Sequence, residues 1–394
     1  MTVIAGYRRT PFVRSNGAFA NVPATALGAH ALAAALAAAG VEPGEVDVVV
    51  GGQVLQGGAG QNPARQAGVG AGVPMTVPAV TLNAVCLSGA EAVVQAHRLI
   101  AGGEAEIVAV VGMESMTLAP HAWVGSRAGQ KFGPVELIDT MAHDGLTDAF
   151  EHDSMGLSTE RHGEEMAAAA WNTREAQDAL AVASHTRAAK AADLLAAEIA
   201  PYDVPGRRGT VRVEADDGVR PDSTLDGLAR LRPAFREDGT ITAGNASQIS
   251  DGAAALVLVS DDVAAARGLT GVRVRSHALV AGPDVGLHAQ PANAIAAACE
   301  RAGVAPRDLG AVEINEAFAA VVLASVDMLG LDPELVNAHG GAIALGHPIG
   351  ASGARVVGHL ARRLELLGAG SVGVAALCGG GGQGSAVLLE APAG

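Results

Sequence analysis

The chain has 394 residues, which is too long for one ordinary hydrophobic core and predicts two or three structural units. It is 49% hydrophobic but only 3% aromatic, with 52 glycines, so we expect closely packed layers of Ala, Val and Leu joined by glycine turns. The net charge of -15 at pH 7 argues against a nucleic-acid surface or an anionic-membrane surface, because both need an excess of Lys and Arg.

The cysteines and the N-terminal segment bear on the cellular compartment. Cys86, Cys299 and Cys378 are an odd and sparse set, which predicts free thiols in a reducing compartment. The first residues, MTVIAGYRRTPF, lack the long apolar run of a signal peptide. The most hydrophobic helical run, residues 27–40, is mostly Ala and holds His30, so we expect no membrane span. These features favour a cytoplasmic protein.

Two distant parts of the chain resemble each other at an almost constant offset of 263 to 264 residues. The matched pairs are residues 29–41 with 292–304, 88–90 with 352–354, and 107–112 with 371–376. The matched segments alternate helix and buried strand, as doubly wound sheets do. The repeat therefore predicts an α/β fold built from two related halves.

The repeat also divides the chain into parts. We expect an N-terminal half over residues 1–117, completed by about 245–267, and a C-terminal half over 268–394. Residues 118–244 have no counterpart and are predicted to form an inserted loop domain. Within it, residues 173–195 have a Thr cap and helical periodicity, whereas residues 202–219 are turn-rich and charged. An insert over a symmetric core often covers a ligand.

Cys86 is a candidate nucleophile. It lies in NAVCLSGAEAVV, where an apolar strand is predicted to end at Val85 and a helix to begin within residues 87–91. Unpaired amide groups and the positive end of the helix dipole at such a position favour thiolate over thiol. The alternative is a buried and inert cysteine.

Asn315 and Glu316 directly follow a predicted strand at residues 311–314. A polar pair at this point faces the carboxyl edge of the sheet, where open α/β sheets bind ligands. Asn315 is therefore a candidate for orienting a water or a carbonyl group. The alternative is that it caps the following helix.

His347 lies in NAHGGAIALGHPIGASGARVV, just ahead of a predicted helix. At the repeat offset it falls near Asn83, three residues before Cys86, so symmetric halves bring the two loops together. A histidine at this place can take the proton of a cysteine nucleophile. The alternative is a loop histidine that caps backbone groups.

Cys378 follows a predicted strand at residues 371–377 and precedes four glycines, residues 379–382. Without Cβ atoms, the backbone amides of this run can approach a developing oxyanion closely. The alternatives are a tight turn and, more weakly, a phosphate cradle, since no Lys-Ser/Thr follows the glycines. His30, His97 and His185 have no partner at metal spacing, so no metal site is expected, and Cys299 is expected in the core.

Taken in order, ten segments of the chain resemble the thiolase family, and the likeness covers nearly the whole sequence. They are RRTPF, GQNPARQA, NAVCLSG, VVGMESM, DGLTDAF, RPAF, TAGNASQISDGAAA, INEAFA, GGAIALGHPIGASGAR and ALCGGGGQG. Within the family the chain looks most like the acetoacetyl-CoA thiolases, through DGLTDAF and the glycine-rich end. The resemblance implies two duplicated α/β halves in α-β-α-β-α layers with an inserted loop domain.

The resemblance also implies roles for the candidate residues. Cys86 attacks an acyl-CoA thioester, His347 activates its sulfur, and Cys378 acts as the acid and base in the condensation of two acetyl-CoA to acetoacetyl-CoA and CoA, or in the reverse thiolysis. One oxyanion site consists of His347 with a water held by Asn315. The other consists of the backbone N–H groups of Cys86 and Gly380.

For the CoA moiety, the resemblance implies a binding site formed in part by the insert. It assigns Arg220 and Ser247 to the nucleotide and pantetheine arm, with Phe235, Ala317 and Phe318 near its tail. Arg220 would then meet a negatively charged ligand on an acidic chain, and the alternative is a solvated surface charge. Coenzyme A thioesters enter as substrates, and no permanently bound cofactor is expected. Relatives form homodimers or homotetramers.

The chain departs from the family pattern near the expected acyl site. Leu87 follows the nucleophile where many relatives have Gly, Ser154 stands where many acetoacetyl enzymes have His, and VGLHAQPA at residues 285–292 is altered. These changes motivate an alternative, a 3-ketoacyl-CoA thiolase that degrades longer chains in fatty-acid breakdown. A ketoacyl synthase normally uses one Cys and two His, and a non-catalytic CoA-binding scaffold is expected to lack a catalytic residue, so both fit less well.

Overall fold

The structure is a computed structural model that describes residues 1–166, 169–206 and 209–392. Its longer strands are β1 (Thr2–Arg9), β3 (Val48–Gly52), β4 (Ala79–Leu82), β5 (Ile107–Ser115), β10 (Ser250–Ser260), β11 (Val272–Ala281), β12 (Ala311–Ile314), β13 (Val372–Gly379) and β14 (Gln383–Glu390). The short strands are β2 (Val13–Arg14), β6 (His121–Ala122), β7 (Ile138–Asp139), β8 (Tyr202–Gly206) and β9 (Gly209–Val213). The α-helices are α1 (Ala24–Ala39), α2 (Pro63–Gly70), α3 (Ser88–Ala101), α4 (Met155–Gly163), α5 (Arg174–Lys190), α6 (Ala192–Ala196), α7 (Leu225–Ala229), α8 (Asp261–Arg267), α9 (Gln290–Ala302), α10 (Ala319–Leu329), α11 (Ala342–Leu345) and α12 (Ile349–Leu367).

The main strands form two half-sheets with the same topology. Read outward from the junction, the order is β1-β10-β5-β3 in the N-terminal half and β11-β14-β13-β12 in the C-terminal half. Each half has two antiparallel pairings followed by one parallel pairing. The halves join where Thr2–Ile4 of β1 pairs with β11. The predicted duplication of an α/β unit is therefore confirmed.

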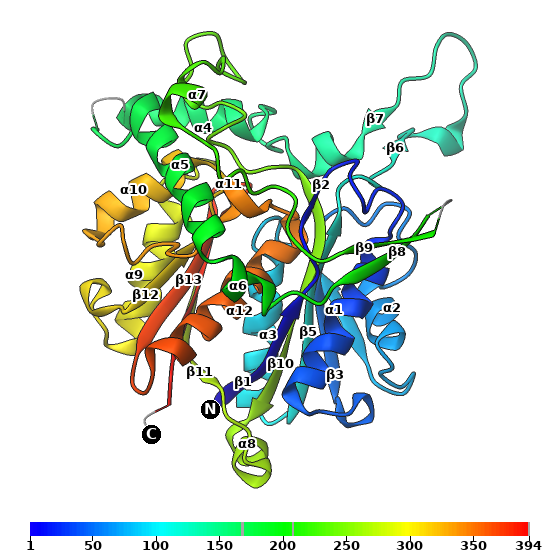
Figure 1. Cartoon of the computed structure of the whole chain (residues 1–394). Coiled ribbons are helices and arrows are strands. Elements are labelled where there is room, and N and C mark those ends of the chain that lie inside the picture. The colour runs from blue at the N-terminus through cyan, green and yellow to red at the C-terminus, as the bar shows by residue number, and fades with distance from the viewer. Residues whose placement is uncertain (167–168, 207–208, 393–394) are drawn as a thin grey trace.

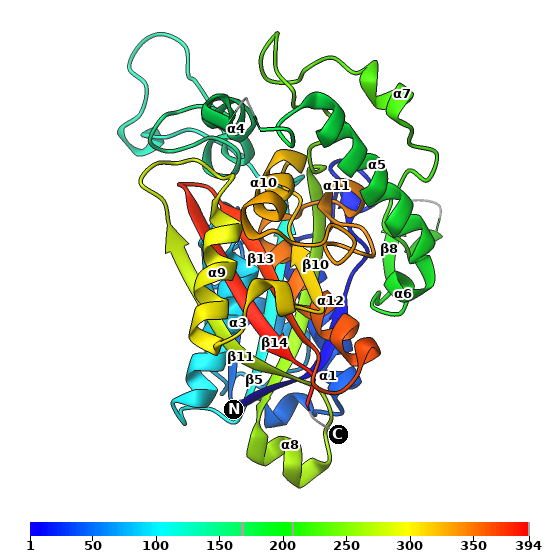
Figure 2. The ribbon, with the colours of Figure 1, turned by 90° about the vertical axis from the view of Figure 1, so that its left-hand side faces the viewer.

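Helices and half-sheets alternate in five layers. One outer layer, with α1 and α2, packs on the N-terminal half-sheet through a core of Val, Ala and Leu, and α9 and α10 form the opposite outer layer. The central helices α3 and α12 lie between the half-sheets. Figure 1 shows the N-terminal half on the right and the C-terminal half on the left, and Figure 2 shows α9 on the outer face of β13 and β14.

The contact between α3 and α12 depends on glycine. A Cβ atom added at Gly89 would lie 2.5 Å from the backbone nitrogen of Ala354, so the two helix backbones are in direct contact there. Gly353 faces the backbone of Ala90 in the same way, and the two glycines are equivalent in the repeat. This contact brings the N-terminal ends of both helices, and the loops before them, to one place.

The insert lies over one end of the layered core, at the top of Figures 1 and 2. The predicted Thr cap is confirmed, because the Thr173 side chain accepts from the Ala176 N–H at the start of α5. Residues 202–219 were predicted to be turns, but β8 and β9 form a hairpin there. In β9, Val211 and Val213 alternate with Thr210 and Arg212, and this supplies the strand pattern that the surrounding charges obscured. The three-part division by residue number stays a prediction.

A buried ion-pair network joins the insert to the core. Arg9 of β1 is fully buried and donates to both carboxylate oxygens of Asp216 at 2.6 and 2.8 Å, and its Nε lies 3.4 Å from Glu198. Glu198 also pairs with His359 of α12. Burial alone would raise the pKa of Glu198, but His359 and Arg9 outweigh it and hold the pKa at about 2. Two carboxylates of the insert therefore neutralise cationic groups of the core.

Most of the predicted core elements agree with the structure, with shifts at their ends. The strand at residues 311–314 is confirmed, and the helix predicted over residues 27–40 is α1. The strand predicted to end at Val85 ends at Leu82, and β13 extends through Cys378, because that residue still pairs with Gly384. Within the described part of the chain, no helix is long and apolar enough to cross a membrane.

The glycine contact predicts a destabilising substitution. Gly89→Ala adds a methyl group against the backbone of α12, and the overpacking outweighs the gain of about 1 kcal/mol in helix propensity. We expect the free energy of unfolding in urea to fall by about 1–3 kcal/mol. Gly44→Ala is the control, because nothing lies within 4 Å of its added Cβ. Equal stability of the two variants would contradict the tight contact.

Candidate active site

The nucleophile loop is a strained turn between β4 and α3. Val85 has a φ of 52°, a conformation that costs a β-branched residue on the order of 1–3 kcal/mol. Hydrogen bonds fix the turn, since the Val85 N–H donates to Asn83 Oδ1 at 2.9 Å and Ser88 Oγ donates to the Val85 carbonyl at 2.7 Å. Cys86 thus lies at the start of α3, as the sequence predicts.

His347 lies in the equivalent loop of the C-terminal half, ahead of α12. Its Nδ1 is 2.6 Å from Ser352 Oγ, and that hydroxyl donates to the Pro348 carbonyl at 3.0 Å. Because Ser352 uses its proton there, Nδ1 of His347 carries the ring hydrogen and donates to Ser352. The other ring nitrogen, Nε2, is then left as an acceptor that can take a proton.

Asn315 is fully buried beyond β12, and its Nδ2 lies 3.5 Å from the ring nitrogens of His347. It does not cap the next helix, because the N-cap of α10 is Phe318. Its Oδ1 has no hydrogen-bond partner among the described residues. That free acceptor, beside His347, can hold a water molecule. Glu316 serves a different purpose, since it accepts from Ser184 and from the Asn337 side chain.

The glycine run after Cys378 has two parts. Gly381 and Gly382 have φ values of 77° and 67° and form the turn between β13 and β14, so the tight turn is correct for these residues. Gly380 instead lines the cavity beside Cys86, and its backbone N–H lowers the pKa of that thiol. The two strands of this hairpin therefore bring Cys378 and a backbone donor to the nucleophile.

These residues share one small cavity of about 60 Å³. It is lined by Val85, Cys86, Gly145, Leu146, Met155, Ser247, Leu287, Ala317, Phe318, His347, Ile349, Cys378, Gly379 and Gly380. Cys86 thus meets two candidates that lie more than 260 residues later in the chain, His347 and Cys378. Asn315 is not in the wall but contacts His347 from behind.

Burial sets the protonation states in this cavity. It raises the pKa of Cys86 to about 11, although backbone hydrogen bonds from Gly380 and within the turn lower it. The prediction that the helix end makes Cys86 a thiolate is therefore wrong, because loss of water outweighs the dipole. Burial, helped by the charge of Arg355, lowers the pKa of His347 to about 4. The pair is a neutral thiol and a neutral imidazole at pH 7.

A groove of about 650 Å³ adjoins the small cavity and shares six wall residues with it. Leu146, Ser154 and Met155 of the insert form part of its wall, so the insert does cover this end of the core. The predicted CoA contacts Phe235, Ser247 and Phe318 line the groove, and the Ser247 N–H donates to the Ala317 carbonyl at 3.0 Å.

Arg220 is placed differently. It is exposed and is absent from the groove wall, while its backbone N–H donates to His185 Nδ1 at 3.1 Å. The cation that lines the groove is Arg14, paired with Asp217 at 3.4 Å. A role for Arg220 in binding CoA stays a prediction.

The three departures from the family pattern lie in different surroundings. Leu87 is fully buried in the central core beneath Gly379, so it lies directly behind the wall of the small cavity and does not line it. Ser154 caps α4 by accepting from the Leu157 N–H and also lines the groove. In the altered segment 285–292, the Leu287 side chain reaches the small cavity.

Ser352 is a functional residue that the sequence interpretation missed. Ser352 is five residues after His347, in the first turn of α12. Side chains of a helix point toward its N-terminus, so the Ser352 hydroxyl lies against the preceding loop and contacts His347. The repeat signal had marked Ser352 as equivalent to Ser88, whose hydroxyl fixes the turn at Cys86. Both serines therefore stabilise a catalytic loop.

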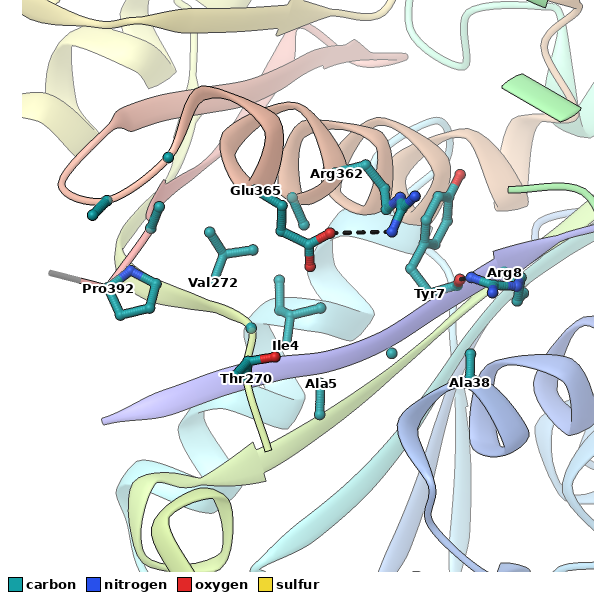
Figure 3. Close-up of a pocket in the computed structure, with 16 residues that line it drawn as sticks. Ile4, Ala5, Tyr7, Arg8, Ala38, Thr270, Val272, Arg362, Glu365 and Pro392 are labelled. Carbon is teal, nitrogen blue, oxygen red and sulfur yellow. Dashed lines mark hydrogen bonds and ion pairs between the residues drawn. The ribbon is translucent and has the colours of Figure 1, made fainter. Parts of the chain in front are cut away.

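A second cavity, of about 510 Å³, lies elsewhere, where β1 and α12 diverge (Figure 3). Its walls include Arg8, Arg362 and Glu365, the last two paired at 3.2 Å. Arg362 is thirteen residues along α12 from the active-site end, or about 20 Å at 1.5 Å per residue. None of the predicted site residues lines this cavity. In the described residues, no group of three or more His, Cys, Asp or Glu could hold a metal ion.

A cysteine at a strained turn, a neutral histidine, a second cysteine and backbone donors around one small cavity can carry out acyl transfer through sulfur. Comparison with known proteins agrees. The thiolase N-terminal domain matches residues 2–262, and the thiolase C-terminal domain matches residues 270–391. The chain belongs to the thiolase family.

Individual relatives span the whole chain. A probable acetyl-CoA acetyltransferase of Mycobacterium tuberculosis is 49% identical over 394 residues, which cover 99% of each protein. The acetyl-CoA acetyltransferase of Rhizobium meliloti is 47% identical and covers 98% of each. The crystal structure of the Bacillus anthracis acetyl-CoA acetyltransferase superposes with a TM-score of 0.94 at 38% identity, covering 99% of this chain and 98% of that one. The expected thiolase fold is confirmed.

The hydrogen bond to Ser352 predicts a kinetic defect. Ser352→Ala leaves Nδ1 of His347 without its partner and frees the ring to rotate or change tautomer. We expect kcat for thiolysis to fall by about 10–100-fold with little change in KM. Ser325→Ala is the matched control, because Ser325 is equally buried and donates to a carbonyl four residues earlier, without a histidine. A similar loss in both variants would refute the assignment.

Proposed function

We propose that the protein is an acetyl-CoA C-acetyltransferase, which condenses two acetyl-CoA molecules to acetoacetyl-CoA and CoA and also catalyses the reverse thiolysis. The observation that carries the proposal is the meeting of Cys86, His347 and Cys378 on one small cavity. The full-length relatives with this activity in their names support it. Each step uses side chains and CoA thioesters, so the proposal requires no resident cofactor.

In the first step, Cys86 attacks the thioester carbonyl of acetyl-CoA. Since the thiol is neutral at pH 7, its proton passes to His347 Nε2 as the carbon–sulfur bond forms. The backbone N–H groups of Cys86 and Gly380 stabilise the oxyanion. The CoA sulfur leaves with the proton of Cys378, which gives acetyl-Cys86 and a Cys378 thiolate.

In the second step, the Cys378 thiolate removes a proton from the methyl group of another acetyl-CoA. The carbanion attacks acetyl-Cys86, and the released Cys86 sulfur regains its proton from His347. Burial and the neighbouring Cys86 both raise the pKa of Cys378, so its thiolate is a strong base, as a weak carbon acid requires. Acetylation removes the possibility of charge on Cys86 and thereby makes the Cys378 thiolate easier to form.

The size of the cavity favours a short acyl group. A volume of 60 Å³ holds about four to six water-sized groups, which suits an acetyl unit and leaves little space for a longer chain. Leu287, Met155 and Phe318 close its walls. This supports acetoacetyl-CoA over the longer substrates of the alternative, a 3-ketoacyl-CoA thiolase in fatty-acid breakdown.

We also propose a cytoplasmic homodimer or homotetramer. The edge strand β4 is partly exposed along its length, and the segment between β6 and β7 presents Phe132 with 94% of its surface exposed. Unpaired strand edges and large exposed aromatic residues are typical of surfaces covered by another subunit. Light scattering during gel filtration measures the assembly, and a monomer at micromolar concentration would contradict it.

Substitutions of the two cysteines are expected to block different steps of the reaction. Cys378→Ala retains Cys86 and His347, so it should still become acetylated by radiolabelled acetyl-CoA, more slowly because CoA then leaves as a thiolate, whereas the condensation rate falls by at least about 1000-fold because no base remains at carbon. Cys86→Ala should take up no label. An unlabelled but folded Cys378→Ala variant, or label on another residue in Cys86→Ala, would overturn these roles.

Substrate preference is tested by thiolysis. We expect kcat/KM for acetoacetyl-CoA to exceed that for a long-chain 3-ketoacyl-CoA by at least about tenfold, because the longer chain does not fit behind Met155 and Leu287. Leu287→Ala should narrow the difference. A preference of the native enzyme for the long chain would support the alternative function.

A further inference from the structure

Glu114 of β5 is a fully buried carboxylate close to the active site. Its Oε2 accepts from the N–H groups of Val54 at 3.0 Å and Gly350 at 2.9 Å, and its Oε1 accepts from Leu55 at 3.2 Å. Val54 and Leu55 follow β3 of the N-terminal half, whereas Gly350 is in the first turn of α12 in the C-terminal half. One carboxylate therefore connects the two halves through three backbone donors.

The Gly350 contact lies three residues after His347. A Cβ atom at Gly350 would be 2.7 Å from the Met113 carbonyl and 2.8 Å from Glu114 Oε2, so β5 and the start of α12 are as close as backbones permit. The charge of Glu114 is also felt at Cys86, where it raises the thiol pKa. Glu114 is thus near both catalytic loops, although it does not line the cavity or the groove.

The repeat gives Glu114 a defined counterpart. In the sheet it lies opposite Gly252 of β10, and Cys378 lies opposite Gly384 of β14 in the equivalent strand pair. At the offset of 264 residues, Glu114 corresponds to Cys378 and Gly350 corresponds to Cys86. The duplication thus gives a second, symmetry-related site, in which Glu114 of the N-terminal half and Gly350 of the C-terminal half take the places of Cys378 and Cys86.

A neighbouring pair supports this equivalence. Gln53 follows β3 as Asn315 follows β12, and both are buried with an amide oxygen that has no partner in the described part of the chain. The symmetry-related site, which carries no cysteine, has therefore retained the layout of the active site. Its Glu114 now accepts backbone hydrogen bonds where Cys378 is predicted to transfer a proton.

We propose that Glu114 is a positioning residue, whose ionised carboxylate holds the His347–Gly350 segment against the loop after β3 and so fixes His347 relative to Cys86. The inference rests on the proposed function of the site. The three backbone N–H groups need both oxygens of Glu114 as hydrogen-bond acceptors. A protonated carboxyl group or an amide would instead present a donor to one of these N–H groups. Loss of the charge therefore loosens the segment, and a misplacement of His347 by about 1 Å can cost on the order of 100-fold in rate.

The surroundings of Glu114 make its ionisation observable. Burial raises its pKa to about 7, against the lowering effect of its three backbone hydrogen bonds. Asp251 on β10 places a second negative charge near Glu114. Cys86, which precedes α3, is a neutral thiol at this pH. The strand β3 carries no ionisable side chain, and His347 is neutral at this pH. Glu91 of α3 accepts a hydrogen bond from Ser385. Arg355 and His359 of α12 lie near Glu198. A kinetic step near pH 7 would therefore report Glu114.

The test measures the rate of Cys86 acetylation by acetyl-CoA between pH 5.5 and 9, conditions chosen to span the Glu114 pKa of about 7. The native enzyme should be fast and independent of pH above about 8, and should slow by about tenfold through a step near pH 7. Glu114→Gln should be at least about tenfold slower at pH 8.5, without the step, and with KM for acetyl-CoA within about twofold of the native value.

Two further variants separate positioning from a general loss of a buried charge. Glu160→Gln is the control, because Glu160 is a buried carboxylate that accepts from the Ile241 backbone in the insert, and it should keep the step. Glu114→Asp keeps the charge but is one methylene shorter, so it should be slow as well. If Glu114→Gln does not fold, the acetylation rate of Glu114→Asp is compared with that of the native enzyme instead.

The outcomes are distinct. A native enzyme without the step, a step that persists in Glu114→Gln, or a Glu114→Gln or Glu114→Asp rate within twofold of native at pH 8.5 would each overturn the role of Glu114. A native enzyme that acetyl-CoA does not acetylate at all would instead overturn the proposed function.

Discussion

The close contact of α3 with α12 is the constraint on which the active site depends. Each helix begins at a catalytic loop, so the distance between the two backbones sets the distance between Cys86 and His347. Gly89 and Gly353 allow that distance, and the half-sheets on either side fix the direction of both helices. The insert then covers the open end of the core, where Met155 and Phe318 line both the small cavity and the groove.

Burial determines the chemistry as much as residue identity does. Removal of water keeps Cys86 a thiol and His347 an imidazole, so neither charge has to form before the substrate arrives. The same burial makes Cys378 a weak acid whose conjugate base is strong. A duplicated scaffold thus provides two environments, one in which cysteines exchange protons and acyl groups, and one in which Glu114 accepts hydrogen bonds from the backbone.

The repeat and the motif spacing were enough to predict two α/β halves and the meeting of the loops that carry Cys86 and His347. The hairpin β8–β9 was missed, because charged residues hide its alternation. The pKa of Cys86 could not be predicted, since the helix dipole is visible in the sequence but the depth of burial is not. Leu87 and Arg220 show the same limit, because a position beside a motif does not tell which way a side chain points. Ser352 and Glu114 act through contacts that only the folded chain creates.

The network around Arg9 has a consequence for how this protein can change. Its cations belong to the core and its anions, Glu198 and Asp216, belong to the segment laid over it. A replacement segment without these two carboxylates would leave the Arg9 guanidinium uncompensated in a dry interior, which typically costs about 3–5 kcal/mol. The covering region is therefore not a separable module, and substrate range is expected to diversify by substitution within it rather than by its replacement.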